Sequence, residues 1–335
     1  MVAGALAALV AAGAIVVLVR PVLGPRMPWA ALVVAVASAI LTVAAGRALD
    51  AGSLEFLIGV SVFALPVLVL LEAAAIASGA MGAWRWLVIL GWGLIVFPLT
   101  FLVPVLATSA CLAPECGFED FAGALPLVVS SGAYMVLAWL PAAGRRSDVA
   151  RLSSRRTVIA VGVLWLASVA WLMHLEGMVD EYTPRIAFAG VVVPVASAVG
   201  WLAVDRLRNV PRSAGRSVLL GLAAGIVVAW PGAVSVGMPW FPIAGLLAGA
   251  AAALVFSALR AVAPAPRWGL TVLAAVGVGF IAPAISGDTV GIIFAARVAV
   301  LAAPLLALTG VSAFSVAVSA PIWMLVRRRP AGESR

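Results

Sequence analysis

Charged residues are scarce in this chain of 335 residues. They make up 10 % of the sequence, whereas a water-soluble domain carries about 25 %. Hydrophobic residues reach 65 %, and the mean hydropathy is +1.20. A water-soluble fold of this size could not hide so much apolar surface. The composition therefore excludes the soluble classes.

The sequence also has no lysine, a single histidine and only two cysteines. One histidine, His174, excludes a metal or haem site built from several histidines. There is no Walker phosphate-binding loop, no dinucleotide-binding glycine motif and no HExxH zinc motif. No nucleophile lies near a base, and the loops are short. We therefore expect no enzyme and no cofactor, which leaves a conduit, a receptor or a scaffold.

Long apolar runs predict an all-α polytopic membrane protein. About 218 residues are apolar and one spanning helix uses about 20, which gives about eleven spans. A β-barrel would instead show short alternating segments. The last run is too long for one upright helix, so we expect it to tilt or to project into the cytoplasm. The expected spans are 2–19, 28–46, 54–79, 84–110, 120–142, 157–176, 184–204, 217–235, 239–260, 268–286 and 290–326.

The arginines gather on alternate loops. Eighteen of the twenty-one lie in odd-numbered loops and the C-terminal tail, and the exceptions are Arg47, Arg185 and Arg297. Most acidic residues lie at the opposite side. The positive-inside rule predicts a multi-pass cell-membrane protein with its N-terminus outside and its C-terminus in the cytoplasm. The rule also accounts for the net charge of +8 without a nucleic-acid partner.

Cys111 and Cys116 share one short loop, CLAPEC, on the predicted outer side. An oxidising compartment permits a disulfide there, so we expect the two residues to staple the loop. The alternative, a two-cysteine metal site, lacks further ligands nearby.

Three stretches of the chain resemble a known family. The first runs from DFAG at 120–123 to the basic turn GRR at 144–146, and the second from LW at 164–165 through Trp171 to Gly177. The third runs from GLAAG at 221–225 through WPG at 230–232 to Gly249. In this order they are similar to the DFAG, LW…GWFGFNxGS and GLVAITPxxGxVxPxxAxxxG stretches of the ammonium transporter family (Amt/Mep/Rh).

The resemblance implies one transmembrane domain of two inverted five-helix halves with a long eleventh helix. The halves would be 1–143 and 157–289, the last helix 290–326, and the short basic tail 327–335. It further implies a homotrimer in a lipid bilayer with one pore in each protomer. An inverted repeat places a site near the bilayer midplane, where the halves meet.

The pore positions depart from the family pattern. Family pores carry two histidines, whose places are taken here by Val128 and Ala275. Neither side chain donates or accepts a hydrogen bond. The outer recruitment positions become Pro104 and Met178, and the two gating phenylalanines correspond to Phe63 and His174.

Three further candidates each have a structural alternative. Asp120 matches the DFAG aspartate that supports the outer vestibule, and it also suits a helix N-cap. His174 either lines a vestibule and titrates near neutral pH, or bonds a loop group at the interface. Trp171 is a pore candidate, but it lies near a span end and also suits interfacial anchoring. The same anchoring is expected of Trp165, Trp201, Trp230 and Trp240.

Two charges fall inside expected spans, Glu72 in the third and Arg297 in the last. Charges at membrane depth are costly, so they usually pair or face a wet cavity. The alternatives are a Glu72–Arg297 pair, local burial with other partners, and snorkelling to an interface.

These features favour a divergent Amt/Rh-like channel or transporter for a small, neutral solute, with ammonium unsuited to the altered pore. The alternative is a pore-inactive scaffold or receptor that binds a ligand or partner protein. The sequence does not identify the solute or ligand.

Overall fold

The structure is a computed structural model that describes residues 2–23, 28–48, 54–78, 80, 82–100, 118–138, 154–177, 179–262, 264–287, 291–295 and 298–327. Over these residues the protein is helical, and its one β pairing is an isolated antiparallel bridge between Val236 and Gly287. Eight helices are long and apolar enough to cross a membrane, and three shorter apolar helices bring the segments to eleven. The expected all-α polytopic membrane fold is confirmed.

The first half of the chain supplies five of these segments. Apolar runs form helices because a helix satisfies its own backbone groups, which lipid cannot do. The elements are α1 (Val2–Leu23), α2 (Trp29–Ala48), α3 (Leu54–Ala77), α4 (Ala83–Leu90), the π-helix η1 (Gly91–Val96), α5 (Phe97–Thr100), the π-helix η2 (Leu125–Val129), α7 (Ser130–Met135) and the 3₁₀ helix η3 (Val136–Ala138).

The second half supplies five more segments, and they start and end close to the expected spans except for the helix that begins at Ala214, which ends ten residues before the expected span does. The elements are α9 (Ser154–Glu176), α10 (Thr183–Leu207), α11 (Ala214–Gly225), the 3₁₀ helix η4 (Met238–Trp240), α12 (Phe241–Ala258) and α13 (Pro264–Ser286).

The last segment is divided, unlike the single helix expected over 290–326. A short helix α14 (Ile292–Ala295) and a 3₁₀ turn η5 (Val298–Leu301) precede α15 (Ala302–Arg327). Pro304 lies in the first turn of α15, where the missing N–H of proline breaks no helical bond. The residues on both sides of this division are apolar, and the charged Arg297 between them is its sign in the sequence.

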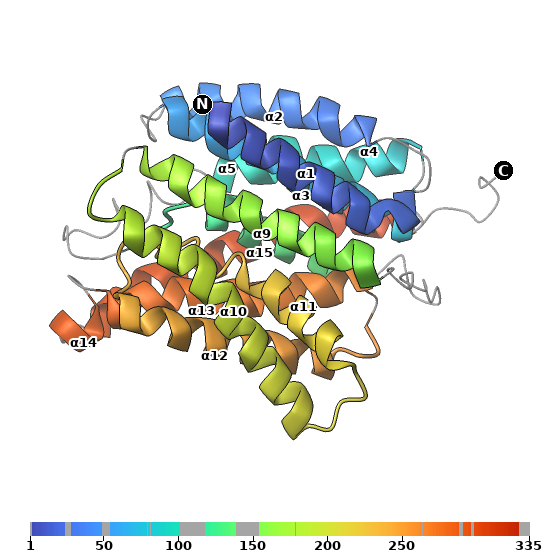
Figure 1. Ribbon diagram of the computed structural model, residues 1–335. Coiled ribbons are helices and arrows are strands. Elements are labelled where there is room, and N and C mark those ends of the chain that lie inside the picture. Colours follow the sequence, from blue (N-terminus) through green and yellow to red (C-terminus); the bar gives the residue numbers. More distant parts are fainter. Residues whose placement is uncertain are drawn as a thin grey trace.

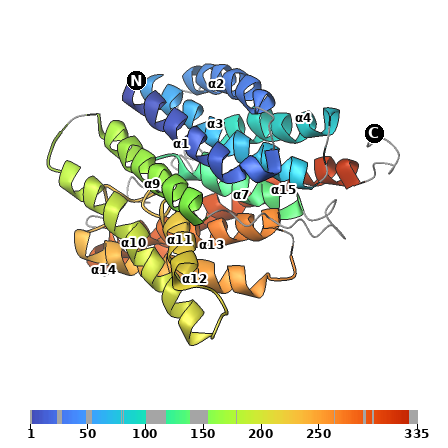
Figure 2. The same ribbon diagram turned by 45° about the vertical axis from the view of Figure 1, so that its right-hand side comes forward.

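The helices form two groups with a third set between them. In Figure 1, α1–α4 lie in the upper part and α10–α13 in the lower part, and α9 and α15 run between them. Figure 2 places α7 in the middle as well, where it packs against both α13 and α15. At the crossing of α7 and α13, a Cβ on Gly269 would lie 2.5 Å from the carbonyl oxygen of Gly132. Glycine therefore permits the two halves to approach closely.

The chain unwinds after α11 instead of completing the span expected over 217–235. Residues 226–237 form successive turns, although most of them are apolar and buried. Pro231 and Gly232 stand in the middle of this stretch, and both residue types break helices. Discontinuous helices of this kind mark the binding sites of many transporters.

Candidate functional site

Two unwound segments meet in the interior of the bundle. Residues 118–123 precede η2, and residues 226–237 follow α11. The backbone N–H of Phe121 donates to the carbonyl of Pro231 at 3.2 Å, and that of Ala122 donates to the carbonyl of Trp230 at 3.1 Å. These bonds satisfy backbone groups that would otherwise be unpaired at membrane depth.

Asp120 organises the first of these segments. Its two carboxylate oxygens accept the backbone N–H groups of Ala124 at 2.6 Å and Leu125 at 2.8 Å. Gly123, directly before Ala124, has a φ of 72°, a conformation that strains any residue with a Cβ. Asp120 therefore satisfies free N–H groups at the start of the fifth span, as a capping acid does.

Three aromatic side chains from three different elements converge on the unwound segments. Phe63 of α3 lies 4.6 Å from Trp171 of α9 and 5.7 Å from Trp230, measured between ring centroids. Their exposed fractions are 4 %, 0 % and 5 %. We call Phe63, Trp171 and Trp230 the aromatic cluster. It brings one expected pore residue of α3 together with one of α9.

Both indole groups of the aromatic cluster are hydrogen-bonded. Trp171 donates from Nε1 to the carbonyl of Ala122 at 3.2 Å, and Trp230 donates to the hydroxyl of Ser168 at 2.7 Å. The interpretation of these two tryptophans, and of Trp201, as interfacial anchors is wrong, since all three are buried. A buried indole needs an acceptor, and each of them has one inside the protein.

The two positions expected to have lost pore histidines lie on packed elements. Val128 belongs to η2 and Ala275 to α13, and these elements contact each other. Their exposed fractions are 7 % and 0 %. The neighbouring hydroxyls of Ser130 and Ser131 bond carbonyls of the preceding turn. These serines therefore do not replace the missing imidazoles as free polar groups.

His174 lies one helical turn beyond Trp171, with 6.0 Å between the two ring centroids. Its ring occupies the space over Gly4 of α1, where a Cβ would come within 2.2 Å of His174 Cδ2. The structure therefore places this half-buried histidine at the contact between α9 and α1.

Glu119, Arg185 and Ser235, which we call the polar rim, lie together at the end of the second unwound segment. Arg185, in the first turn of α10, donates to the carbonyl of Val234 at 2.8 Å. Burial raises the pKa of Glu119, although nearby Ser235 and Arg185 favour its charged form. The stacked rings of Phe118 and Phe280, 5.9 Å apart, hold the start of the first segment against α13.

Glu72 is buried, with 1 % of its side chain exposed, and it has local partners. It accepts the backbone N–H of Ala31 at 3.1 Å and pairs with Arg85 at 3.3 Å. Among the interpretations of this carboxylate, the geometry is that of local burial with other partners. Arg297 lies outside the described residues, as do Met178, Cys111 and Cys116.

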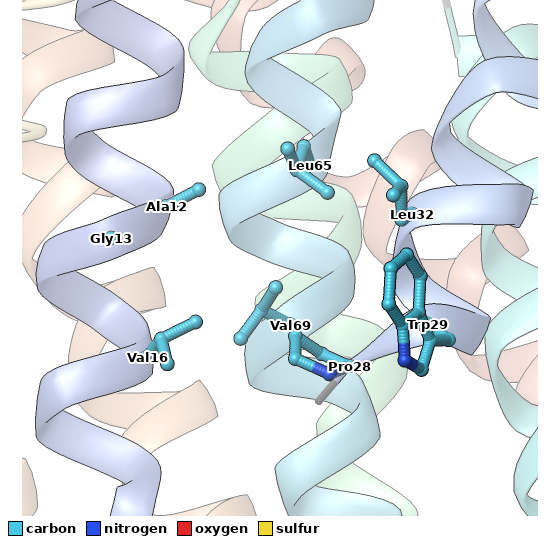
Figure 3. Close-up of a pocket in the computed structure, with 8 residues that line it drawn as sticks. All are labelled: Ala12, Gly13, Val16, Pro28, Trp29, Leu32, Leu65 and Val69. Atoms are coloured by element: carbon cyan, nitrogen blue, oxygen red, sulfur yellow. The ribbon is translucent and has the colours of Figure 1, made fainter. Parts of the chain in front are cut away.

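A pocket of about 140 Å³ lies between α1, α2 and α3 (Figure 3). No charged side chain and no member of the aromatic cluster lines it. The pocket lining is Ala12, Gly13, Val16, Pro28, Trp29, Leu32, Leu65 and Val69.

In the described part of the chain, no three His, Cys, Asp or Glu residues gather as a metal site would require.

Sequence reasoning missed Trp230 and Ser168 as parts of this site. The hydropathy of 217–235 predicts a continuous span around Trp230, and Ser168 has no motif around it. The Pro231-Gly232 pair was the available signal, because such a pair marks a turn and thus a break in the span.

This arrangement defines the class of the protein, a polytopic membrane protein with the Amt/Mep fold. No family model and no curated protein matches the sequence. Among solved structures, Mep2 of Candida albicans is similar with a TM-score of 0.76 and 18 % identity, over 99 % of this chain and 86 % of that one. Mep2 of Saccharomyces cerevisiae is similar with a TM-score of 0.73 and 15 % identity, over 96 % and 86 %.

A third structure, described as a sensor Amt protein, is similar with a TM-score of 0.68 and 12 % identity, over 97 % of this chain and 93 % of that one. The TM-scores establish a shared fold, and at identities this low the likeness carries no function with it. The fold expected from the DFAG and related stretches is thus confirmed.

Proposed function

We propose that this protein is an Amt-like membrane channel or transporter for a small, neutral solute, with the aromatic cluster as its gate. The main support for this proposal is the burial of Phe63, Trp171 and Trp230 where the two unwound segments meet. The fold is shared with Mep2 proteins and a sensor Amt protein, which favours transport over an enzymatic role.

The chemistry of the proposed path disfavours a cation. A desolvated ammonium ion needs fixed polar partners to offset the cost of leaving water. Val128 and Ala275 offer none, and the indole N–H groups of Trp171 and Trp230 are donors that already have acceptors. A neutral solute pays a much smaller desolvation cost than an ion, so it suits this path better.

The test is solute flux into proteoliposomes that contain the purified protein. Urea and glycerol serve as neutral probes in light-scattering assays, and ammonium-evoked current is recorded on solid-supported membranes. We expect Phe63→Ala and Trp230→Ala to raise neutral flux above that of the unaltered protein. Phe188→Ala is the matched control, since Phe188 is 39 % exposed on α10. A saturable ammonium current in the unaltered protein would contradict the proposal.

The same packing supports a second candidate, a pore-inactive scaffold or receptor. Both indoles of the aromatic cluster are bonded and all three rings are buried, as in a permanently packed core. If this candidate is right, neutral flux stays at the level of protein-free liposomes in the unaltered protein and in both gate variants.

Orientation and assembly belong to the same proposal. We place the protein in a cell membrane, with its N-terminus outside and its C-terminus in the cytoplasm. Each copy would consist of two inverted halves, 1–143 and 157–289. Three copies would form one assembly. Single-cysteine variants at Ser147 and Ser213 should label only from the cytoplasmic side. Native mass spectrometry should give a trimer, and unreduced peptides should contain a Cys111–Cys116 disulfide.

A further inference from the structure

The end of the bundle away from the polar rim is strongly basic. α10 begins near that rim at Thr183, and its far end at Leu207 leads into the loop before α11. The loop between α12 and α13 lies at the same end, because α12 packs along α10 and begins, like α10, near the rim. Four arginines at this end, which we call the arginine cluster, are Arg212, Arg216, Arg260 and Arg267.

One aromatic ring holds two of these guanidinium groups. Arg267 lies 3.5 Å from the centroid of the Phe256 ring and donates from Nε to the carbonyl of Phe256 at 2.8 Å. Arg212 lies 5.2 Å from the same centroid. The side chains are therefore pre-positioned, and binding would cost them little rotamer freedom.

The acidic side chains beside the arginine cluster do not neutralise the charge of its four arginines. Asp205, 3 % exposed, pairs with Arg212 at 2.5 Å, and the same carboxylate oxygen accepts bonds from Trp201 and Ser217. Arg216 and Arg260 are exposed and have no ion-pair partner in the described part of the chain. Arg212, Arg216 and Arg260 all lie close enough to act electrostatically on Arg267.

The positive-inside rule accounts for arginines on this side of the membrane, but not for the convergence of Arg212 and Arg267 on the ring of Phe256. Like charges repel, so a fold that gathers four of them gains from a bound anion. Guanidinium groups match phosphate oxygens in shape and charge, often through paired hydrogen bonds. The first turn of α11 adds the positive end of a helix dipole beside Arg216.

We propose that the arginine cluster binds a phosphate group, supplied either by an anionic phospholipid or by a soluble phosphate compound. The site is independent of the proposed transport path, since it shares no residue with the aromatic cluster. Arg212 and Arg267 form its fixed base, and exposed Arg216 and Arg260 close over the ligand.

The test uses the full-length protein in two arms. In the first, native mass spectrometry measures binding of phosphatidic acid against phosphatidylcholine in an uncharged detergent. In the second, calorimetry measures binding of inorganic pyrophosphate in the same detergent. The test variant is Arg216→Gln with Arg260→Gln. The control is Arg206→Gln with Arg208→Gln, which removes the same charge from exposed residues at the same end.

We expect the test variant to lose about tenfold in affinity for the probe that binds, while the control changes by less than about twofold. Binding of phosphatidic acid without pyrophosphate identifies a lipid headgroup, and the reverse identifies a soluble ligand. Equal losses in the two variants would show diffuse charge attraction and overturn the proposal. Failure of the unaltered protein to bind either probe would overturn it as well.

Discussion

The two halves of the bundle use different means to hold their helices together. In the second half, α10 and α12 touch through backbone, since a Cβ on Gly249 would lie 1.9 Å from the carbonyl oxygen of Ser197. In the first half, Gly13 of α1 has no atom within 4 Å of its would-be Cβ and lines the pocket of Figure 3. Gly249 thus permits backbone contact between two helices, whereas Gly13 leaves open space beside the pocket.

Each half also buries one carboxylate, with a different set of partners. Glu72 joins three helices, because its partners Ala31 and Arg85 lie on α2 and α4. The partners of Asp205 are close to it in sequence. One of its carboxylate oxygens accepts hydrogen bonds from Trp201, Arg212 and Ser217. The comparison teaches that the first half relies on a long-range ion pair, and the second on close helix contact and local bonds.

The largest effect should come from filling the close contact in the second half. Gly249→Ala would place a methyl group against backbone of α10, which cannot rotate away as a side chain can. We expect a loss of about 3 kcal/mol or more in the free energy of unfolding. Thermal melting in detergent measures it. Gly13→Ala is the matched control and should melt at the same temperature or slightly higher. Equal losses in both variants would remove the contrast between the halves.

The next largest effect should distinguish Glu72 from Asp205 by the stability that is lost when the arginine partner of each is removed. Arg85→Leu removes the ion-pair partner of a carboxylate that is 1 % exposed, and we expect a loss of about 3 kcal/mol. Arg212→Leu leaves Asp205 with two neutral donors, so the loss should be smaller, about 1–2 kcal/mol. Thermal melting again provides the measurement. A double variant, Glu72→Leu with Arg85→Leu, should recover stability relative to Arg85→Leu alone.

The smallest effect should follow Ser217→Ala. It removes one of three bonds to Asp205 and leaves the ion pair with Arg212 in place. We expect a loss of about 1 kcal/mol. Thr309→Ala is a control, since Thr309 is exposed on α15 and bonds only its own helix. A loss at Ser217 as large as that at Arg212 would mean that the three bonds act as one unit.

Much of the fold could be predicted from the sequence because hydropathy is a local property. Long apolar runs interrupted by arginine predict helices of spanning length, and the structure has helices close to those positions. The DFAG stretch predicts a capping role for Asp120, which depends on residues four and five positions away in the chain. Both features depend on neighbours in sequence, so they can be read without a tertiary structure.

Only the tertiary structure decided which apolar segment is not helical and which distant side chains contact each other. Residues 226–237 are as apolar as a helix, and they form turns because backbone from 118–123 and side chains such as Arg185 satisfy them. Phe63, Trp171 and Trp230 are far apart in sequence, so their contact depends on the packing of α3 and α9 around that break. Hydropathy records how much each residue avoids water, whereas these contacts depend on shape and on hydrogen bonds between distant segments.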